Sequence, residues 1–211
     1  MQDFNEELLI AGKKIVVQIQ NLLSIKQAPI VVAIDGGSGA GKSTLASVIN
    51  HEFDIVLIPL DDFFSANIPD SEWDKFTVAE KLKNVFDWNR LRNDVLEPLL
   101  AGKPTKWHAF DFQSGLRVDG TYGMETEPKE LPPANAIVIE GAYSSSPEIA
   151  DLVDMTILVD VPIKERHARL ETRDEDHDFL EKWHLRWDEV EVYFFNQVRP
   201  KNSFDMIVEI K

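Results

Sequence analysis

A short glycine-rich stretch constrains this chain more than any other feature. Residues 36–43 read Gly-Gly-Ser-Gly-Ala-Gly-Lys-Ser and fit the pattern G-x-x-x-x-G-K-[ST] without a mismatch. The apolar residues 30–34 precede this stretch and predict a strand buried on both faces. Leu45, Val48 and Ile49 follow it at helical spacing. Strand, loop and helix therefore come in the order that a phosphate-binding loop requires.

This loop predicts a site for a nucleoside triphosphate. Glycines permit backbone angles that other residues avoid, so successive N–H groups can turn toward a phosphate. The helix that follows adds the partial positive charge of its N-terminus. Lys42 can reach the β- and γ-phosphates and the Ser43 hydroxyl can bind Mg²⁺, so ATP and Mg²⁺ are the expected cofactors. The residues expected to hold the nucleotide are Gly36, Gly37, Ser38, Gly39, Ala40, Gly41, Lys42, Ser43 and Thr44.

The composition narrows the class of protein that carries the loop. The chain has 211 residues, of which 44% are apolar, as expected for a single domain with its own core. It has no apolar run of about 18 residues and no basic start typical of a signal peptide, so neither a membrane span nor secretion is expected. The absence of cysteine is compatible with the cytoplasm, and the net charge of −15 argues against nucleic acid as a partner. Both a monomer and a homo-oligomer fit these numbers.

Alternating strand and helix patterns indicate an α/β fold. After the first strand, apolar runs predict further strands at residues 55–59, 136–141, 155–159 and 204–210. Helical spacing predicts helices at residues 4–23, 77–85, 87–100, 164–173 and 176–196. This alternation implies a parallel sheet covered on both faces. The expected architecture is a three-layer P-loop NTPase fold with a five-stranded parallel sheet.

The segment 65–133 is the least regular part of the sequence and is expected to form a small insertion on the acceptor side. Residues 65–73 resemble a loop, and residues 106–112 predict a short strand or hairpin arm. Asp87 is expected to cap the helix that follows it. The N-terminal helix is expected to pack on the sheet, because its weak basic bias gives little support to the alternative of a membrane-surface helix.

Transfer of a phosphoryl group needs a cradle for the phosphates, a metal ion, a group that deprotonates the acceptor, and cations near the transferred charge. Asp61 and Asp62 follow the second strand, at the edge where open α/β sheets bind ligands. Either carboxylate can accept a proton from a hydroxyl and help to hold Mg²⁺. Glu140 ends another apolar strand and is a candidate for binding the metal or the acceptor. Arg166, Arg169 and Arg173 form one basic helical face, expected to close over the phosphates as a lid at residues 163–178.

Each of these candidates also has a purely structural interpretation. One of the two aspartates can simply cap a turn, and the arginines can pair with Glu165, Glu171, Asp174 or Asp176 on the surface. The aromatic residues Trp183, Trp187, Tyr193 and Phe194 recur at helical steps and are expected in the core rather than as a stacking platform. The histidines show no metal-ligand spacing and are expected to be surface residues or satisfied by neighbours. They are His51, His108, His167, His177 and His184.

Together these motifs resemble the uridine kinase and phosphoribulokinase-like group of P-loop kinases, which includes nicotinamide riboside kinases. The resemblance runs from about residue 30 to residue 210. Asp61-Asp62-Phe63-Phe64 is similar to the group's Asp-x-Phe-Tyr/Phe motif, whose first Asp acts as base and metal partner. This implies that Asp61 is the base and that Asp62 and Phe63 lie near the acceptor. Ile139-Glu140-Gly141 is similar to a motif whose Glu lies near the metal and the acceptor.

The resemblance also implies roles for Asp87, as the residue that binds a ribose, and for Arg166, Arg169 and Arg173, as the lid. One part of the family pattern is missing. The uridine–cytidine enzymes carry an aromatic residue followed five positions later by a His that reads the pyrimidine, whereas here Phe110 is followed by Gly115. The resemblance therefore implies kinase chemistry, with Phe110 at the acceptor, without reproducing the pyrimidine pocket.

The expected function is an ATP- and Mg²⁺-dependent kinase that phosphorylates a hydroxyl of a small molecule, such as a nucleoside or a sugar-like acceptor. In this interpretation Asp61, Lys42 and Arg169 are the catalytic residues. Ser43, Asp61 and Glu140 hold the metal. Two alternatives remain open at this point. One is a nucleotide-dependent switch or binding module without a small-molecule acceptor, and the other is a nucleoside-monophosphate kinase.

Overall fold

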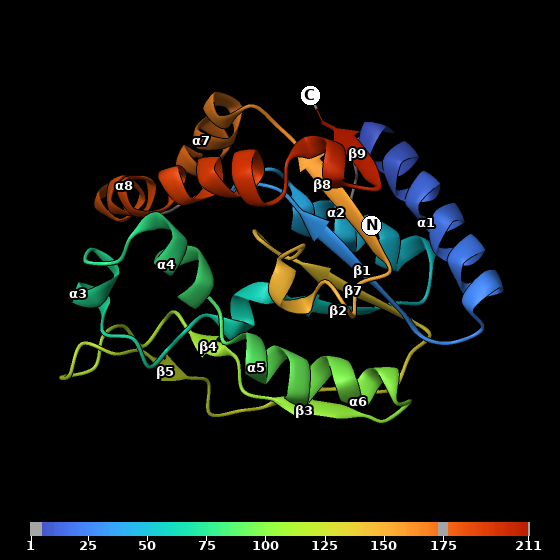
Figure 1. The fold of residues 1–211 in the computed structure, drawn as a ribbon, viewed down its shortest axis with the longest axis horizontal. Coiled ribbons are helices and arrows are strands. Elements are labelled where there is room, and N and C mark those ends of the chain that lie inside the picture. The colour runs from blue at the N-terminus through green and yellow to red at the C-terminus, as the bar shows by residue number, and fades with distance from the viewer. Residues whose placement is uncertain (1–5, 173–176, 211) are drawn as a thin grey trace.

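The computed structural model describes residues 6–172 and 177–210 and contains an α/β fold (Figure 1). Within those residues one sheet of five strands runs in the order β2-β7-β1-β8-β9, and every neighbouring pair is parallel. The expected architecture is therefore confirmed. The strands are β1 (Ile30–Asp35), β2 (Val56–Pro59), β7 (Ala136–Glu140), β8 (Met155–Asp160) and β9 (Met206–Glu209).

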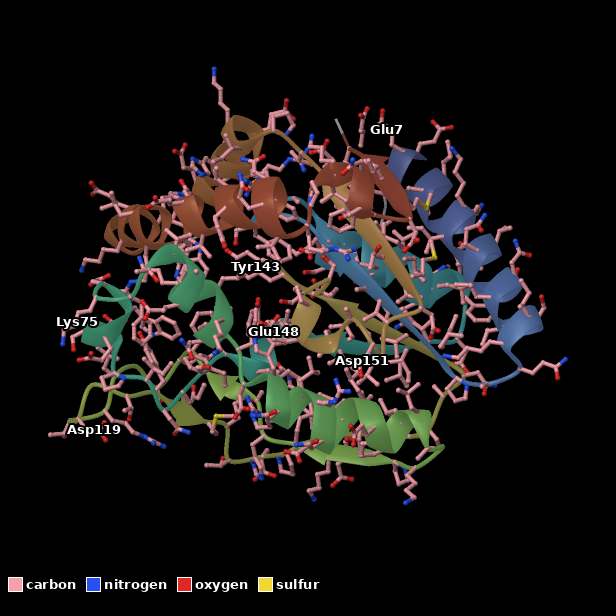
Figure 2. The ribbon with its side chains drawn as sticks, in the orientation of Figure 1. Glu7, Lys75, Asp119, Tyr143, Glu148 and Asp151 are labelled. Atoms are coloured by element: carbon pink, nitrogen blue, oxygen red, sulfur yellow. The ribbon has the colours of Figure 1, made fainter. Side chains whose placement is uncertain are left out.

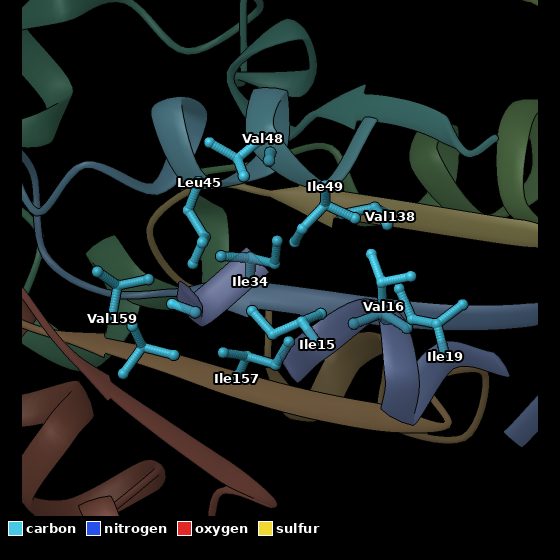
Figure 3. Packing of buried hydrophobic residues seen from close by; sticks show 14 of the residues in the cluster. Ile15, Val16, Ile19, Ile34, Leu45, Val48, Ile49, Val138, Ile157 and Val159 are labelled. Atoms are coloured by element: carbon cyan, nitrogen blue, oxygen red, sulfur yellow. The ribbon is translucent and has the colours of Figure 1, made fainter. Parts of the chain in front are cut away.

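Two helices cover one face of the sheet. They are α1 (Glu6–Lys26) and α2 (Lys42–Glu52), and they pack on each other as well as on the strands. Figure 3 shows Ile15 of α1 and Leu45 of α2 beside Ile34 of β1, and all three side chains are fully buried. Burial of these branched apolar side chains stabilises this layer by roughly 2 kcal/mol for each.

The opposite face of the sheet carries a second apolar cluster. Successive residues of β1 point to opposite faces, so Val32 belongs to the first cluster and Val31 to the second. Trp88, Leu91 and Phe194 pack in this second cluster. The helices on this face are α4 (Val78–Asn84), α5 (Trp88–Arg90), the π-helical turn η2 (Leu91–Leu96), α6 (Glu97–Leu100), α8 (His177–Tyr193) and the π-helical turn η4 (Phe194–Val198).

The expected insertion contains more regular structure than the sequence indicated. The supposed loop at 65–73 ends in a short helix, α3 (Asp70–Trp73), because Trp73 is buried and anchors that turn among aromatic side chains. The expected hairpin arm is divided between two small antiparallel sheets, β3–β6 and β4–β5. Their strands are β3 (Thr105–Trp107), β4 (Phe110–Asp111), β5 (Gly123–Met124) and β6 (Lys129–Leu131).

Short helical segments connect the ends of the strands to these layers. Asp87 caps α5 as expected, because its carboxylate accepts a hydrogen bond from Arg90 N at 3.0 Å. The remaining helices are the 3₁₀ turns η1 (Leu60–Phe63), η3 (Pro147–Ile149) and η5 (Lys201–Ser203), and α7 (Ile163–Glu171).

Helix α1 is the one described helix that is long and apolar enough to cross a membrane by length and composition alone. Leu8, Ile15, Val16 and Ile19 are buried against the sheet and α2, whereas Ile10, Val17 and Ile25 are exposed. A single helix of this kind is weak evidence for a membrane span, because helices of soluble proteins and signal sequences pass the same test.

Candidate active site

Three neighbouring strands end side by side and bring the predicted site residues together. In the register of the sheet, Glu140 at the end of β7 lies opposite Ile34 of β1 and Pro59 of β2. The glycine-rich loop leaves β1 at this edge, and Asp61 follows β2 there. The parallel topology therefore collects all three segments at the carboxyl edge of the sheet, where α/β proteins bind ligands.

The glycine-rich loop forms a turn that ends directly in α2. Gly41 caps the helix with φ 94°, a left-handed conformation that suits glycine, and Lys42 is the first helical residue. The free N–H groups of the first turn of α2 therefore face the loop. Lys42 is buried, and its Nζ donates to Gly37 O at 3.1 Å across the loop.

The carboxylate of Asp35 holds the start of the glycine-rich loop in place. This buried carboxylate accepts hydrogen bonds from the backbone N–H groups of Gly36, Tyr143 and Ser145 at 2.7, 2.8 and 2.9 Å. Burial raises the pKa of Asp35, and hydrogen bonds from the Ser145 hydroxyl and from the backbone N–H groups of Ser145 and Gly36 oppose the shift. Figure 2 shows Tyr143 in the middle of the molecule, where its ring packs against Phe194 at a centroid distance of 5.0 Å. Asp35 thus ties the glycine-rich loop to the segment after β7.

A cavity opens at the loop, and two of the three predicted catalytic residues, Lys42 and Asp61, line it, whereas Arg169 does not. Asp61 and Glu140 face it from the neighbouring strand ends, opposite Lys42 and Ser43. The loop and the start of α2 contribute Ser38, Gly39, Gly41, Lys42, Ser43 and Thr44, and the other lining residues include Phe64, Phe86, Trp183, Trp187 and Glu191. The cavity therefore brings together loop amides, a cation, acidic side chains and aromatic rings.

The two carboxylates in the cavity hold protons more readily than ordinary acids do. Asp61 opens onto the cavity, yet the surrounding protein removes enough water to raise its pKa, with Lys42 opposing and Asp62 adding to the shift. Burial also raises the pKa of Glu140, while the charge of Lys42 and a hydrogen bond with Ser43 lower it. Oxygen atoms of Ser43, Asp61 and Glu140 thus face one space, and a hard divalent cation prefers such ligands.

Asp62 and Phe63 lie outside the cavity, although the sequence placed them at the acceptor. The carboxylate of Asp62 accepts hydrogen bonds from Trp107 Nε1 at 2.9 Å and Lys129 Nζ at 2.7 Å. Phe63 is fully buried and stacks on Trp107. The next residue, Phe64, lines the cavity instead, because consecutive side chains along this 3₁₀ turn point in different directions. The sequence alone does not distinguish the two phenylalanines, because they are adjacent residues of the same type.

The predicted basic face of α7 rests against the glycine-rich loop. Arg166 is buried and donates through Nη1 to Ser38 O at 2.7 Å. It pairs with Glu191 Oε2 at 2.9 Å rather than with the surface acids near it in the sequence. Arg169 Nη1 lies 3.5 Å from Ala40 O. Arg173 lies outside the described residues, and a lid movement remains a prediction.

Glu191 is a site residue that the sequence analysis missed. It is buried, lines the cavity, and its Oε1 accepts a hydrogen bond from the loop amide of Ser38 at 2.7 Å. A Cβ at Gly37 would lie 2.2 Å from Arg166 Nη1 and 2.6 Å from Glu191 Oε2, so glycine is required there for close approach. A signal existed in the four-residue spacing of Trp183, Trp187 and Glu191 along one helix.

An aromatic hollow adjoins the cavity through shared walls. Phe64, Trp183 and Trp187 line both spaces, and the hollow continues to Trp73, Phe110, Phe112 and Tyr122. Phe110 is buried there and contacts Phe112 and Tyr122 at centroid distances of 4.5 and 5.0 Å. Trp187 is a core residue as expected, but Trp183 is half-buried and faces both spaces. Asp87 lines a separate hollow beside Ser65 and Asn67.

Comparison with known proteins agrees with the kinase-like arrangement of this site. Residues 31–177 match the model of the Phosphoribulokinase / Uridine kinase family. The chain belongs to this family. It is 33% identical over 150 residues to a uridine kinase of Clostridium perfringens, which covers 69% of this chain and 68% of the relative. A uridine kinase of Brevibacillus brevis is 26% identical over 176 residues, covering 82% and 76% of the two chains. The protein is therefore a kinase, as the motifs predicted.

Solved structures agree with the fold of this kinase. A possible uridine kinase from Bacillus stearothermophilus aligns over 92% of this chain and 98% of its own, with a TM-score of 0.60 and 18% identity. A D-glycerate 3-kinase from Cryptococcus neoformans aligns over 92% and 88%, with a TM-score of 0.53 and 13% identity. The alignments show that this kinase shares the P-loop kinase fold.

Proposed function

We propose that this kinase uses ATP and Mg²⁺ to phosphorylate a hydroxyl group of a small, ring-bearing alcohol such as a nucleoside. One observation carries the proposal. Lys42, Ser43, Asp61 and Glu140 surround a single cavity, and that cavity shares Phe64 with an aromatic hollow. A triphosphate at the loop and a ring in the hollow would place a hydroxyl between them, beside Asp61.

The residues at the loop suit both cofactors. The N–H groups at the start of α2 and the Lys42 ammonium would hold the β- and γ-phosphates. Ser43, Asp61 and Glu140 would hold Mg²⁺, which neutralises charge on the phosphates when it is bound. Arg166 and Arg169 lie against the loop and would add positive charge near the transferred group.

Asp61 is the proposed general base. Its carboxylate would accept the hydroxyl proton as the acceptor oxygen forms a bond to the γ-phosphorus and the bond from that phosphorus to the ADP oxygen breaks. The pKa of Asp61 is raised toward neutral pH, which makes its carboxylate a better proton acceptor. Lys42 would stabilise the charge on the transferred phosphoryl group.

The aromatic walls favour an acceptor that carries a planar ring. Aromatic side chains bind rings by stacked and edge contacts, whereas a polyol needs many polar partners. The hollow contains few polar groups, among them Asp70 and Arg186, which pair with each other at 2.6 Å. The named relatives are uridine kinases. Because Phe110 and Gly115 cannot supply the usual pyrimidine contacts, we propose an acceptor other than uridine. We further propose a cytoplasmic kinase of one domain, with an acceptor side at 65–133 and a lid at 163–178.

The test is ADP release measured with Mg²⁺-ATP and a panel of acceptors. The panel contains purine and pyrimidine nucleosides, other ring-bearing alcohols, ring-free hydroxy acids, simple sugars and nucleoside monophosphates. We expect a ring-bearing alcohol to stimulate ADP release and Lys42→Ala to abolish the stimulation. Stimulation by monophosphates alone would indicate a nucleoside-monophosphate kinase. No stimulation by any acceptor, with slow hydrolysis, would indicate the switch or binding module.

A further inference from the structure

Three potential metal ligands gather between α7 and α8, away from the strand ends. His167 comes from α7, while His184 and Asp188 lie one turn apart on α8. Their ligand atoms all lie within 4.8 Å of one another. Spacing along the sequence does not show this group, because one of the ligands comes from a different helix. The i,i+4 spacing of His184 and Asp188 was a visible part of the signal.

The distances fit a shared cation. His167 Nε2 lies 3.2 Å from Asp188 Oδ2, and His184 Nδ1 lies 3.2 Å from Asp188 Oδ1. Two ligands on a tetrahedral zinc ion, with bonds near 2.0–2.1 Å, lie about 3.3 Å apart. All three side chains are partly shielded, with exposed fractions of 29, 21 and 31%.

The imidazole rings of the two histidines also contact each other across the two helices. The rings of His167 and His184 are in contact and tilted, with centroids 3.8 Å apart and 37° between their planes. His167 Nε2 is buried, and its contact with Asp188 lacks hydrogen-bond geometry. A buried nitrogen without a hydrogen bond is costly unless another partner completes it.

We propose that His167, His184 and Asp188 form a site for Zn²⁺ or a similar divalent transition metal. Two imidazole nitrogens and one carboxylate, with water as a fourth ligand, suit this class, whereas Mg²⁺ prefers oxygen ligands. The neighbouring surface hollow is lined by His184 and Asp188 together with Glu171 and Glu181, which gives the ion access from solvent and further negative charge.

The proposed metal site lies between two helices that both contribute residues to the loop or the cavity wall. The ion would join α7, which carries Arg166 against the glycine-rich loop, to α8, which carries Trp183 and Glu191 on the cavity wall. Metal binding would thus fix the two helices relative to each other. The proposed site does not depend on which acceptor the kinase uses.

The test uses the full chain after dialysis against a chelator, without nucleotide. We expect Co²⁺ to produce the visible absorption of a four-coordinate ion at one equivalent, Zn²⁺ to displace it, and either ion to raise the unfolding temperature. His184→Gln should weaken Co²⁺ binding about 100-fold or more, since even partners of metal ligands contribute 10–100-fold. His51→Gln, on an exposed position of α2, is the matched control and should bind as the unchanged protein does.

The same titration separates this site from the proposed Mg²⁺ site. Asp61→Asn should keep the absorption, because oxygen ligands at the strand ends favour six-coordinate Co²⁺ with weak absorption. If His184→Gln is poorly folded by circular dichroism, Asp188→Asn takes its place, because it keeps the side-chain shape. Absence of the four-coordinate spectrum, or a spectrum that survives both substitutions, would overturn the proposal and leave only a His–Asp contact between helices.

Discussion

Asp61 and Asp62 are adjacent in sequence but lie in different environments. Asp61 faces Lys42 and Glu140 across the cavity, whereas Asp62 is held by Trp107 and Lys129 on the other side of η1. The same side-chain chemistry thus supplies a candidate base at one position and a structural anchor at the next. The local direction of the chain after β2 decides between them.

Asp61→Asn should separate activity from stability. Loss of the base lowers kcat by about 10²–10⁴-fold if Asp61 accepts the proton. The unfolding temperature at pH 7 should not fall, because an amide removes a charge that is unfavourable in this cavity. Steady-state kinetics and thermal unfolding measure the two effects. An unchanged kcat would exclude Asp61 as the base.

The pH dependence of turnover should report the same carboxylate. Because the pKa of Asp61 is raised, the acid limb of kcat/KM should lie at higher pH than for an ordinary aspartate. Asp62→Asn removes a negative neighbour that raises this pKa, so the limb should move to lower pH. For stability the sign is opposite to that of a salt-bridged acid. Asp61 keeps its proton to higher pH in the folded protein than in the unfolded chain. Its contribution to stability is therefore lost as the pH rises from the pKa of the unfolded chain through the higher pKa of the folded protein.

Glu191→Gln should tighten nucleotide binding. The carboxylate of Glu191 faces the cavity and occupies the amide of Ser38, so it opposes an incoming triphosphate. Removing the charge should lower the Kd of a non-hydrolysable ATP analogue by about fivefold, equivalent to ~1 kcal/mol. The unfolding temperature without nucleotide should fall, since Arg166 loses its buried partner. Glu189→Gln, exposed on the same helix, is the control for calorimetry. Weaker binding in Glu191→Gln would contradict this account.

Helix α8 is the element that connects the separate parts of the site. Trp183, Trp187 and Glu191 follow one another at four-residue steps and line the cavity. His184 and Asp188, one position further round the helix, meet α7. One face of α8 therefore lines the cavity and the aromatic hollow, and the adjacent face contacts α7, the helix that carries Arg166 and Arg169.

Trp183→Leu should affect the acceptor more than the nucleotide. Trp183 lines both the cavity and the aromatic hollow, and a leucine keeps an apolar surface without a ring to stack. We expect the KM for the acceptor to rise about tenfold, equivalent to ~1.4 kcal/mol, with the Kd for ATP unchanged. Leu185→Ala, on an exposed position of α8, is the control. A rise confined to the KM for ATP would place the acceptor elsewhere.

At the scale of the whole molecule, the two helices behind the sheet support the glycine-rich loop. Helix α1 packs on α2, which begins at Lys42. The contact depends on Gly12, because a Cβ there would lie 2.5 Å from Val48 Cγ1. Close approach of these helices therefore sets the position of the helix whose N-terminus forms the phosphate site.

Gly12→Ala should destabilise the fold despite the higher helix propensity of alanine. The propensity gain is about 1 kcal/mol, while overpacking a filled core costs about 1–3 kcal/mol. Val48→Ala makes room for the added methyl group, so Gly12→Ala in that background should stabilise by up to ~1 kcal/mol. Urea unfolding of the four members of this double-mutant cycle measures the coupling. Additive effects would show that the contact does not limit the packing.

The sequence by itself determined the fold and the chemical class of this protein. The glycine-rich loop, the apolar runs of the strands and the acids at their ends depend on local spacing, and they predicted the five-stranded sheet and the kinase family that the structure and the relatives confirm. Asp61 and Glu140 could be placed because parallel strands end at one edge.

Only the tertiary structure decided which neighbours share the cavity. It separated Asp61 from Asp62 and Phe64 from Phe63, since those pairs differ in side-chain direction rather than in residue type. It brought Glu191 to Ser38 and His167 to His184, contacts between helices that no local period encodes. Local patterns fix elements, whereas the packing of one element on another fixes the partners of each side chain.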